Sequence, residues 1–582
     1  MNRRRAGMAS ITGRLQAERQ LYKEKLKECA SPLQRLVSAH LPAFLNPSSG
    51  GPAAAAGGGA GAAGGGWQMH GLFAKAAVNG ATELLPLIAD PAGLPEGTRG
   101  LLELLHGAAN QLMAGVPAGA PLPPAELEVW RELAGRLHER VCKCIIAHLD
   151  SHPLPFAEYV PYFLRLFVDA ALLQLDAGTL RGMRPKRRVL LVRFLAKALL
   201  CPYYRPEYVE AQGLGALGGS LVEALHAQRG LALLPELQAR LQQQQQQRQQ
   251  QQQRQEGGRA QGRVAADALQ QLLSKDQVSA VVEALVLKYV ALTHEELEEW
   301  SSDPEGYIRS IEVESGPDAD TPRPVGVGLL LCMLERGGEE VAQALISLTA
   351  RLQAAGEGNS DVVLMREACY RCIGEGYSHV ASIVPFSQWY RSELAGLLRS
   401  RLPAFLGAGG EGSPDIIAAV LQARALWLIG ACGTELEREQ WVDAWGLSVA
   451  HIGARDLVVA LQAVQAVLLL AVQILDDQAI LDQVAAAKLA ASKKGGGAGA
   501  AQLPGLTVGN AAAVDAALSA AEGVQDDEAV TAARERLDWR LAVLTGNMEQ
   551  LLQHVFGLLG RLSEVTSSAL VSVVPRRASW AR

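Results

Sequence analysis

The chain has 582 residues, a formal net charge of -6, 49% hydrophobic residues and 5% aromatic residues. Its length is sufficient to bury a large core. Its mildly acidic balance argues against a general nucleic-acid binder, which needs clusters of basic side chains. The eight cysteines are scattered along the chain, a usage typical of free thiols in a reducing compartment and not of a disulfide framework.

In chain order, helical segments alternate with tracts of low complexity. These tracts are rich in Gly and Ala or in Gln, and they cannot bury enough apolar surface to offset the entropy of ordering. We therefore interpret them as disordered insertions between helices. The predicted parts are an N-terminal helical repeat (1–49), a Gly/Ala linker (50–66), HEAT-like repeats (67–241), a Gln-rich insertion (242–263), further HEAT-like repeats (264–491) with an acidic loop (294–320), a Gly/Ala-rich insertion (492–530), a last HEAT-like repeat (531–574) and a tail (575–582).

Outside the insertions the apolar residues recur with helical spacing, and strand-like alternation is scarce. Apolar helix faces are predicted within 281–290, 417–428 and 551–562. The prolines fall mainly between helical stretches, where they can end or start helices. Examples are Pro153, Pro155, Pro304, Pro322, Pro385, Pro403 and Pro414.

A long all-helical chain folds either as a bundle or as stacked helix pairs, and HEAT and armadillo pairs repeat every ~40–47 residues. The segment 456–464 has the acidic start and small apolar spacing of a HEAT inner helix, although Ala460 stands where a basic residue is usual. We predict an all-α fold, an α-solenoid of HEAT-like helix pairs forming an armadillo-type superhelix. The apolar run 457–475 is interrupted by three glutamines, which favours a buried core helix over a membrane span.

No sequence pattern indicates a catalytic, cofactor-binding or metal-binding site. The glycines at 213, 215 and 218 match G-x-G-x-x-G, but no strand is predicted before them, so we interpret them as a loop. Cys142 and Cys144 lie two apart on a predicted helix and therefore point to different faces. The C-x-x-C pair, Cys369 and Cys372, lies on another predicted helix, where cysteine serves well as a small core residue.

The segment 294–320 is strongly acidic, with ten carboxylates and a single basic residue, Arg309. One interpretation is a solvated loop between helices, as most charge runs are. The other is an acidic lip that attracts basic partners, such as a nuclear localisation segment, by long-range steering. Trp300 and Tyr307 are either an anchor for such a partner or core residues.

The stretch LTHEELEEWSSDPEGYIRS (292–310) resembles a segment of the importin-β (karyopherin-β) family. Further stretches agree with the family in order. They are RLQAERQLYKEKL, HLDSHPLPFAEYVPYFLRL, FLAKALLCPYYRP, LMREACYRCIGEGYSHVASIVPFSQWYRSEL, RALWLIG and NMEQLLQHVFGLLGRLSEVT. The family's Ran-binding repeats precede the matched region, so we expect a middle fragment of the superhelix.

The resemblance implies a nuclear transport receptor that shuttles between nucleus and cytoplasm. Its implied partners are protein cargo, phenylalanine-glycine (FG) nucleoporins and the GTP form of the Ran GTPase, with no membrane and no direct nucleic acid. It also implies that Trp300, Asp303, Pro304 and Glu305 are protein-interaction positions. The alternatives are a cytoplasmic HEAT-repeat scaffold and an exportin of the same superfamily.

Overall fold

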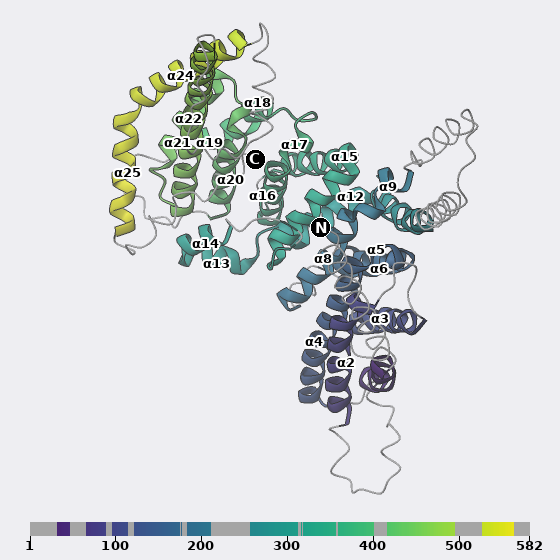
Figure 1. Ribbon diagram of the computed structural model, residues 1–582. Helices are drawn as coiled ribbons and strands as arrows, with labels where there is room; N and C mark the ends of the chain where they lie inside the picture. The colour runs from purple at the N-terminus through teal and green to yellow at the C-terminus, as the bar shows by residue number, and fades with distance from the viewer. Residues whose placement is uncertain are drawn as a thin grey trace, which may run out of the picture. The chain divides into compact units, whose positions relative to one another are not determined.

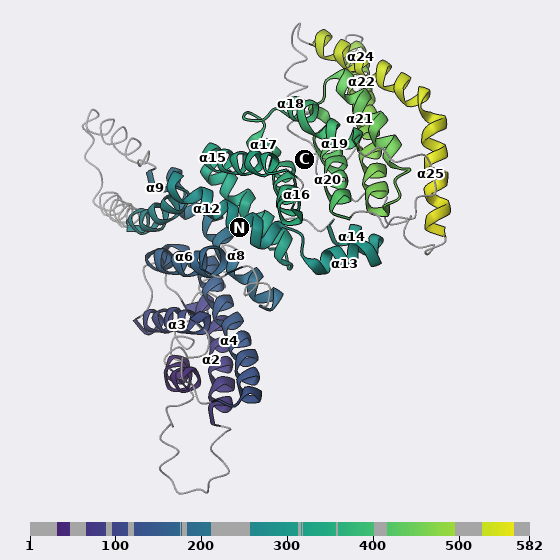
Figure 2. The same cartoon turned by 180° about the vertical axis from the view of Figure 1, so that it is seen from behind.

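The computed structural model describes most of the chain, and its described residues form helices with no strand. Figure 1 and Figure 2 show these helices from opposite sides. The chain divides into two compact units, each formed by two segments. Unit 1 is Met1–Val290 with Glu314–Leu345, and unit 2 is Ala291–Val313 with Ile346–Arg582. The described residues are 32–46, 66–88, 96–114, 122–174, 176, 183–210, 257–311, 316, 318–356, 359–400, 416–494 and 526–563.

Unit 1 stacks its helices in two rows. In one row α2 packs on α4 and α4 on α8, and in the other α3 packs on α6 while α12 packs on η3. The helices of this unit are 32–45, α2 (Gly66–Ile88), α3 (Glu96–Ala114), α4 (Pro124–Ser151), α5 (Pro153–Phe156), η2 (Ala157–Tyr159), α6 (Val160–Val168), η3 (Asp169–Leu173), α8 (Pro185–Leu200), η4 (Pro202–Tyr204), α9 (Pro206–Glu210), 257–272, α12 (Lys275–Leu285) and η6 (Val286–Val290).

Unit 2 repeats this two-row arrangement. One row runs α16, α20, α22 and α24, each packed on the next, and the other runs α19, α21 and α25. The helices are α13 (His294–Ser302), α14 (Pro304–Ile311), α16 (Ser360–Glu375), α17 (Tyr377–Val380), α18 (Phe386–Trp389), η7 (Tyr390–Leu394), α19 (Ala395–Arg399), α20 (Ile416–Cys432), η8 (Gly433–Glu435), α21 (Arg438–His451), α22 (Leu457–Lys494), α24 (Asp526–Gly546) and α25 (Met548–Ser563). α15 (Pro322–Ala354) passes from unit 1 to unit 2 at Leu345.

Prolines mark the helix starts, as the sequence predicts. Pro153, Pro304 and Pro322 are the first residues of α5, α14 and α15, where the missing N–H costs no hydrogen bond. Pro385 directly precedes α18. Pro155 instead lies inside α5, within its first turn, and Pro403 and Pro414 lie outside the described residues.

Aromatic clusters fill the space between the rows. In unit 1 the rings of Phe167 and Phe194 stack with centroids 4.4 Å apart, which joins α6 to α8. In unit 2 the rings of Trp441 and Trp445 stack at 5.4 Å, and Trp441 Nε1 donates to Gln473 Oε1 on α22 at 3.0 Å. Ring pairs of this kind add to the area that they bury, so these clusters stabilise helix-on-helix packing.

The backbone of α15 requires a glycine at position 338. α15 is kinked at Gly338, whose φ of 49° and ψ of -125° lie in a region that only glycine adopts without strain. The kink lies in unit 1 and divides α15 into two helical parts, the second of which continues into unit 2.

The apolar run 457–475 forms part of α22. Two helical stretches, Ile416–Glu435 and Leu457–Val484, are long and apolar enough to cross a membrane, but 61% of each window is buried inside the structure. α22 packs against α20, α21 and α24. The prediction of a buried core helix is therefore confirmed for this run.

Several predicted boundaries need correction. The segment 294–320 is not one loop, because it contains α13 and α14, and the capped start of α13 makes a helix favourable there. Residues 257–263 of the predicted Gln-rich insertion belong to the helix 257–272. Two further helices extend into the predicted insertion 492–530. α22 enters it at its start, because the Ala- and Lys-rich end of this helix favours helix propagation. α24 begins within its last residues, because acidic side chains stabilise the first turn of a helix.

Other predicted features lie outside the described residues. These are the tail 575–582, the glycine motif 213–218, residues 50–65 of the predicted linker 50–66, and the first family-like stretch, which starts at Arg14. The last linker residue, Gly66, instead begins α2. The predicted apolar face on 551–562 is described, and it is only partly buried. Leu562 is buried on α25, whereas Leu552 and Phe556 are 46% and 66% exposed.

Candidate protein-interaction sites

The acidic helix α13 begins with a reciprocal cap. Glu296 N donates to Thr293 Oγ1 at 3.2 Å, and Thr293 N donates to Glu296 Oε2 at 2.7 Å. This capping box satisfies two main-chain donors that the helix cannot satisfy internally. Glu296 is thereby used for structure, which leaves Glu295 and Glu298 as exposed carboxylates on the helix. Glu298 lies 3.3 Å from the ring of His294, one turn earlier.

Trp300 is a core residue and not an exposed anchor. Its side chain is 4% exposed, and its ring lies 4.9 Å from that of Tyr307, which is 1% exposed. Trp300 Nε1 donates to Asp456 Oδ2 at 2.9 Å, and Asp456 Oδ1 accepts from Val459 N at 3.0 Å at the start of α22. Asp456 therefore caps α22 and fixes the α13–α14 hairpin to it.

The three other predicted positions differ from one another in exposure. Asp303 is exposed, and its Oδ1 accepts from Gly306 N at 2.9 Å, which caps α14. Pro304 is the first residue of α14 and is half-buried. The Glu305 side chain is only 10% exposed and lies 3.8 Å from Arg309. Among these positions Asp303 offers its carboxylate to solvent.

The carboxylates of the predicted acidic lip are divided between the two compact units. Asp318 and Asp320 belong to unit 1, whereas α13 and α14 belong to unit 2. Lys197 Nζ lies 3.4 Å from Asp318 Oδ1, and Arg193 Nη2 lies 3.3 Å from Asp320 Oδ1. Basic side chains of α8 thus partly neutralise these two carboxylates. Sequence reasoning counted the charges but missed their partners, which lie more than a hundred residues earlier.

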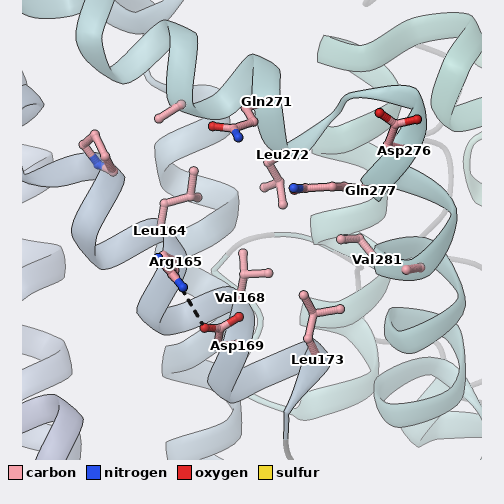
Figure 3. A pocket seen from close by; sticks show the side chains of 13 residues that line it. Leu164, Arg165, Val168, Asp169, Leu173, Gln271, Leu272, Asp276, Gln277 and Val281 are labelled. Carbon is pink, nitrogen blue, oxygen red and sulfur yellow. Dashed lines mark ion pairs between the residues drawn. The ribbon is translucent and has the colours of Figure 1, made fainter.

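A groove in unit 1 is a second candidate site. It lies between α6 with η3 on one side and the helices 257–272 and α12 on the other, with a volume of about 490 Å³. Figure 3 shows apolar side chains from both sides turned toward this space, with the ion pair between Arg165 and Asp169 beside it. The main lining residues are Leu164, Val168, Leu173, Leu272, Gln277 and Val281.

One wall of the groove contains a local change of helix geometry. At η3 the chain adopts a π-helical turn, and its last residue, Leu173, lines the groove with 47% of its surface exposed. π turns are often found at functional sites. Leu164 and Val281 form buried walls, 5% and 1% exposed. No sequence pattern predicted this groove, because each wall is an ordinary apolar helix face.

The cysteine-containing helices offer no reactive centre in the described part of the chain. Burial raises the pKa of the Cys142 and Cys144 thiols to about 12, so both carry their protons at neutral pH. Cys369 and Cys372 are fully buried in α16. Among the described residues no group of three or more His, Cys, Asp or Glu side chains could hold a metal ion.

Two rows of stacked helices in each unit define an all-α protein of the HEAT-repeat type. A stretch of 156 residues is 26% identical to importin-11 of Homo sapiens and likewise 26% identical to importin-11 of Mus musculus. The match covers 26% of this chain and 14% of each relative. The resemblance of the chain to the importin-β family is confirmed by this similarity.

A comparison with solved structures found a similarity to a nuclear transport receptor of S. cerevisiae. The solved structure is that of Lph2, described as a novel bidirectional nuclear transport receptor in S. cerevisiae, with a TM-score of 0.48 and 13% identity. The superposition covers 75% of this chain and 37% of that chain. No family model matches the chain.

Proposed function

We propose that this protein is a nuclear transport receptor, importin-11-like, which binds protein cargo and carries it into the nucleus, where Ran-GTP releases it. The single observation that carries this proposal is the similarity to importin-11 over 156 residues. The stacked HEAT-type helices agree with it, because small rotations between neighbouring repeats add up to changes of curvature that a ligand can select. The protein would act by binding alone, without catalysis, and would shuttle between nucleus and cytoplasm.

The acidic hairpin α13–α14 is the proposed contact for basic segments of cargo. Its exposed carboxylates include Glu298 and Asp303, and the buried contact of Trp300 with Asp456 holds the hairpin in place. Rim charges of this kind accelerate association more than they raise final affinity. We therefore expect basic peptides to associate fastest at low salt.

The variant Glu298→Gln/Asp303→Asn tests this contact, since Asn keeps the cap on Gly306. We expect a roughly fivefold slower association with a fluorescent peptide of consecutive lysines and arginines at low salt. The control is Glu128→Gln/Glu132→Gln, which removes two exposed carboxylates from α4 in unit 1. Equal slowing by both variants would mean that net charge, and not the hairpin, attracts the peptide.

The groove beside η3 is the proposed contact for FG nucleoporins. Its apolar walls suit a phenylalanine side chain, and its rim carries Arg165, Asp169 and Gln277, which can bind the peptide main chain. The variant Leu173→Asp places a charge on the rim at an already exposed position and should abolish retention on an FG-repeat column. Tyr162→Ser, on the 63% exposed neighbour Tyr162, should retain binding.

The transport function as a whole is tested with the full chain and purified Ran. We expect binding to Ran loaded with a non-hydrolysable GTP analogue, no binding to Ran-GDP, and loss of bound cargo when Ran-GTP is added. Cargo that binds more tightly in the presence of Ran-GTP would instead indicate an exportin. The transport function is contradicted if the protein binds both nucleotide forms of Ran equally, or neither, and is not retained on FG repeats. These results together would favour a cytoplasmic scaffold.

A further inference from the structure

Basic side chains gather where the start of α8 packs against α4 within unit 1. Arg140 and Lys143 lie on α4, Arg184 is the residue before α8, and Lys186 is in its first turn. We call these four residues the α4–α8 basic cluster. The first turn of α8 contains no acidic residue.

Two contacts hold the start of α8 against this part of α4. Arg184 Nη1 lies 3.2 Å from Glu139 Oε1, and Arg187 Nε donates to His138 Nδ1 at 3.0 Å. These contacts join neighbouring residues of α4 to residues on either side of Lys186. The backbone that carries Lys186 is therefore fixed beside α4.

Lys143 lies next to two other cations. It is one turn after Glu139 on the same face of α4, the face that meets the start of α8. Burial lowers the pKa of the Lys143 ammonium group, and the positive charges of Lys186 and then Arg140 lower it further, against a smaller opposing effect of Glu139. The fold thus places three positive charges close together.

The cluster has more cations than carboxylates to neutralise them. Glu139 is buried and already lies beside Arg184. In the part of the chain that the structure describes, Arg140, Lys143 and Lys186 take part in no ion pair. Like charges held close together repel and reduce stability, and such a concentration of one charge attracts counter-ions.

The cluster is accessible from solvent. Lys186 is exposed, and Arg140 and Lys143 are half-buried. The excess of positive charge is local, because the chain as a whole has a formal net charge of -6. An anion can therefore reach these side chains without displacing any ion-pair partner of the three.

The closeness of the cations favours one kind of anion. A carboxylate carries a single negative charge, and so does each phosphate of a nucleic-acid backbone. A phosphomonoester carries about -1.5 to -2 charges at pH 7 and has three strong acceptor oxygens. Two ammonium groups and a guanidinium group side by side match one such dianion better than a row of single charges.

We infer that the α4–α8 basic cluster binds a phosphomonoester group of a partner molecule, through Lys143, Lys186 and Arg140. The site lies outside the acidic hairpin α13–α14 and the groove beside η3. It prefers the opposite charge to that of α13, and it does not depend on transport through nuclear pores.

A phosphorylated peptide tests the inference on the full chain. The probe is a fluorescein-labelled peptide of glycine and alanine with one central phosphoserine, followed by fluorescence anisotropy at low salt in a buffer without phosphate. We expect it to bind at least about tenfold more tightly than the same peptide with aspartate in place of phosphoserine. Lys143→Gln/Lys186→Gln should weaken phosphopeptide binding about tenfold.

The matched control changes the same net charge on the same helix. Arg131→Gln/Arg136→Gln removes two exposed cations of α4 that already pair with glutamates, and it should leave phosphopeptide binding at the wild-type level. Equal weakening by both double variants would overturn the inference, because net charge would then explain the binding. Equal binding of the aspartate and phosphoserine peptides would also overturn it.

Thermal unfolding checks that the cations repel one another. Lys186→Gln removes one of two neighbouring like charges, so its midpoint in phosphate-free buffer should equal or exceed that of the wild type. A lower midpoint would mean that Lys186 already has a stabilising partner within the chain, and it would overturn the inference.

Two further probes identify the source of the phosphate. A labelled dinucleotide with one phosphodiester and no terminal phosphate should bind at least about tenfold more weakly than the phosphopeptide, and equal binding would overturn the inference in favour of nucleic acid. Inorganic phosphate should displace the labelled phosphopeptide. Displacement at the same concentration as unlabelled phosphopeptide supports a small phosphorylated molecule, and a requirement for about tenfold more supports a phosphorylated protein. No displacement would overturn the inference.

Discussion

Three buried arginines of unit 2 pair with carboxylates, whereas three arginines of unit 1 donate to main-chain carbonyls. In unit 2 the partners include buried carboxylates. Arg424 Nη2 lies 2.6 Å from Glu367 Oε1, and Arg540 Nη1 lies 2.6 Å from Asp477 Oδ2, with all four side chains at most 7% exposed. Arg366 pairs with Glu393 in the same unit.

In unit 1 three arginines donate to main-chain carbonyls near helix ends. Arg188, Arg323 and Arg336 each reach from one helix to the last carbonyls of another. The acceptors are the carbonyls of Lys288 for Arg188, Val290 for Arg323, and Leu199 and Tyr204 for Arg336.

The difference determines how sensitive each unit is to the loss of one partner. A buried ion pair requires the desolvation of two charges, and removal of one partner leaves the other charge buried and unpaired, at a cost of about 3–5 kcal/mol. A carbonyl at a helix end that loses its donor is neutral, and its penalty is about 1–3 kcal/mol. Unit 2 should therefore respond more strongly to single charge removals than unit 1.

The largest effect is expected for Glu367→Ala in unit 2. It leaves Arg424 buried without its carboxylate, so the free energy of unfolding should fall by about 3–5 kcal/mol. Urea unfolding followed by tryptophan fluorescence measures this, since the ring of Trp427 lies 4.7 Å from the Arg424 guanidinium group. Arg391→Ala, on an ion pair with 69% and 67% exposed partners, should change stability by less than about 0.5 kcal/mol.

A double variant sharpens this prediction. Glu367→Met/Arg424→Met removes both charges and fills their space with apolar groups, so most of the lost stability should return. If Glu367→Ala alone costs less than about 1 kcal/mol, the buried pair is not what distinguishes unit 2.

A smaller effect is expected for Arg336→Met in unit 1. The apolar chain of similar length keeps the packing but removes the donors to Leu199 O and Tyr204 O, for a loss of about 2 kcal/mol. The same urea titration applies. Arg205→Met is the control, because Arg205 and its partner Glu335 are 41% and 45% exposed. A loss as large as that of Glu367→Ala would remove the proposed difference between the units.

Lowering the pH should reduce the stability of unit 1 because of His148. Burial, and secondarily the charge of His152, lower the pKa of His148 from 6.5 to about 3. The folded state therefore keeps the His148 ring neutral, while the unfolded chain binds a proton below pH 6.5. The stabilisation from this group is complete above pH 6.5 and is lost as the pH falls toward 3. From pH 7 to pH 5 the unfolding free energy should fall by about 2 kcal/mol through this group.

The variant His148→Leu isolates this contribution. Neither ring nitrogen of His148 has a hydrogen-bond partner among the described residues, so leucine should be tolerated at pH 7. Chemical denaturation at pH 7 and pH 5 should show a shallower pH dependence in the variant. His294→Gln, at an 83% exposed position, should keep the wild-type dependence. An unchanged slope in His148→Leu would contradict the assignment.

The smallest effect is expected at the start of α13. Thr293→Ala removes the side-chain half of the capping box and should cost about 1 kcal/mol, felt locally in this helix. Hydrogen exchange of the α13 amides should accelerate about fivefold, while α22 is unaffected. Ser301→Ala, on an exposed hydroxyl of the same helix, should leave the exchange rates unchanged.

The local rules of the sequence account for much of the fold. Helical spacing of apolar residues and prolines at helix starts predicted an all-α chain of stacked helices, because both depend on neighbours within a few residues. The family resemblance of 292–310 rests on a short local stretch in the same way. The sequence also predicted that 457–475 is a core helix, from its interrupting glutamines.

Tertiary structure decided which helix covers each apolar face and which charge meets each carboxylate. Trp300 is buried in the core, where its indole N–H donates a hydrogen bond to Asp456, 156 residues later in the chain. Asp318 and Asp320 contact basic side chains of α8, more than a hundred residues earlier, and the groove lies where two distant helix pairs meet. Periodicity records that a helix has an apolar side, but burial depends on contacts between segments that the periodicity of one helix does not specify.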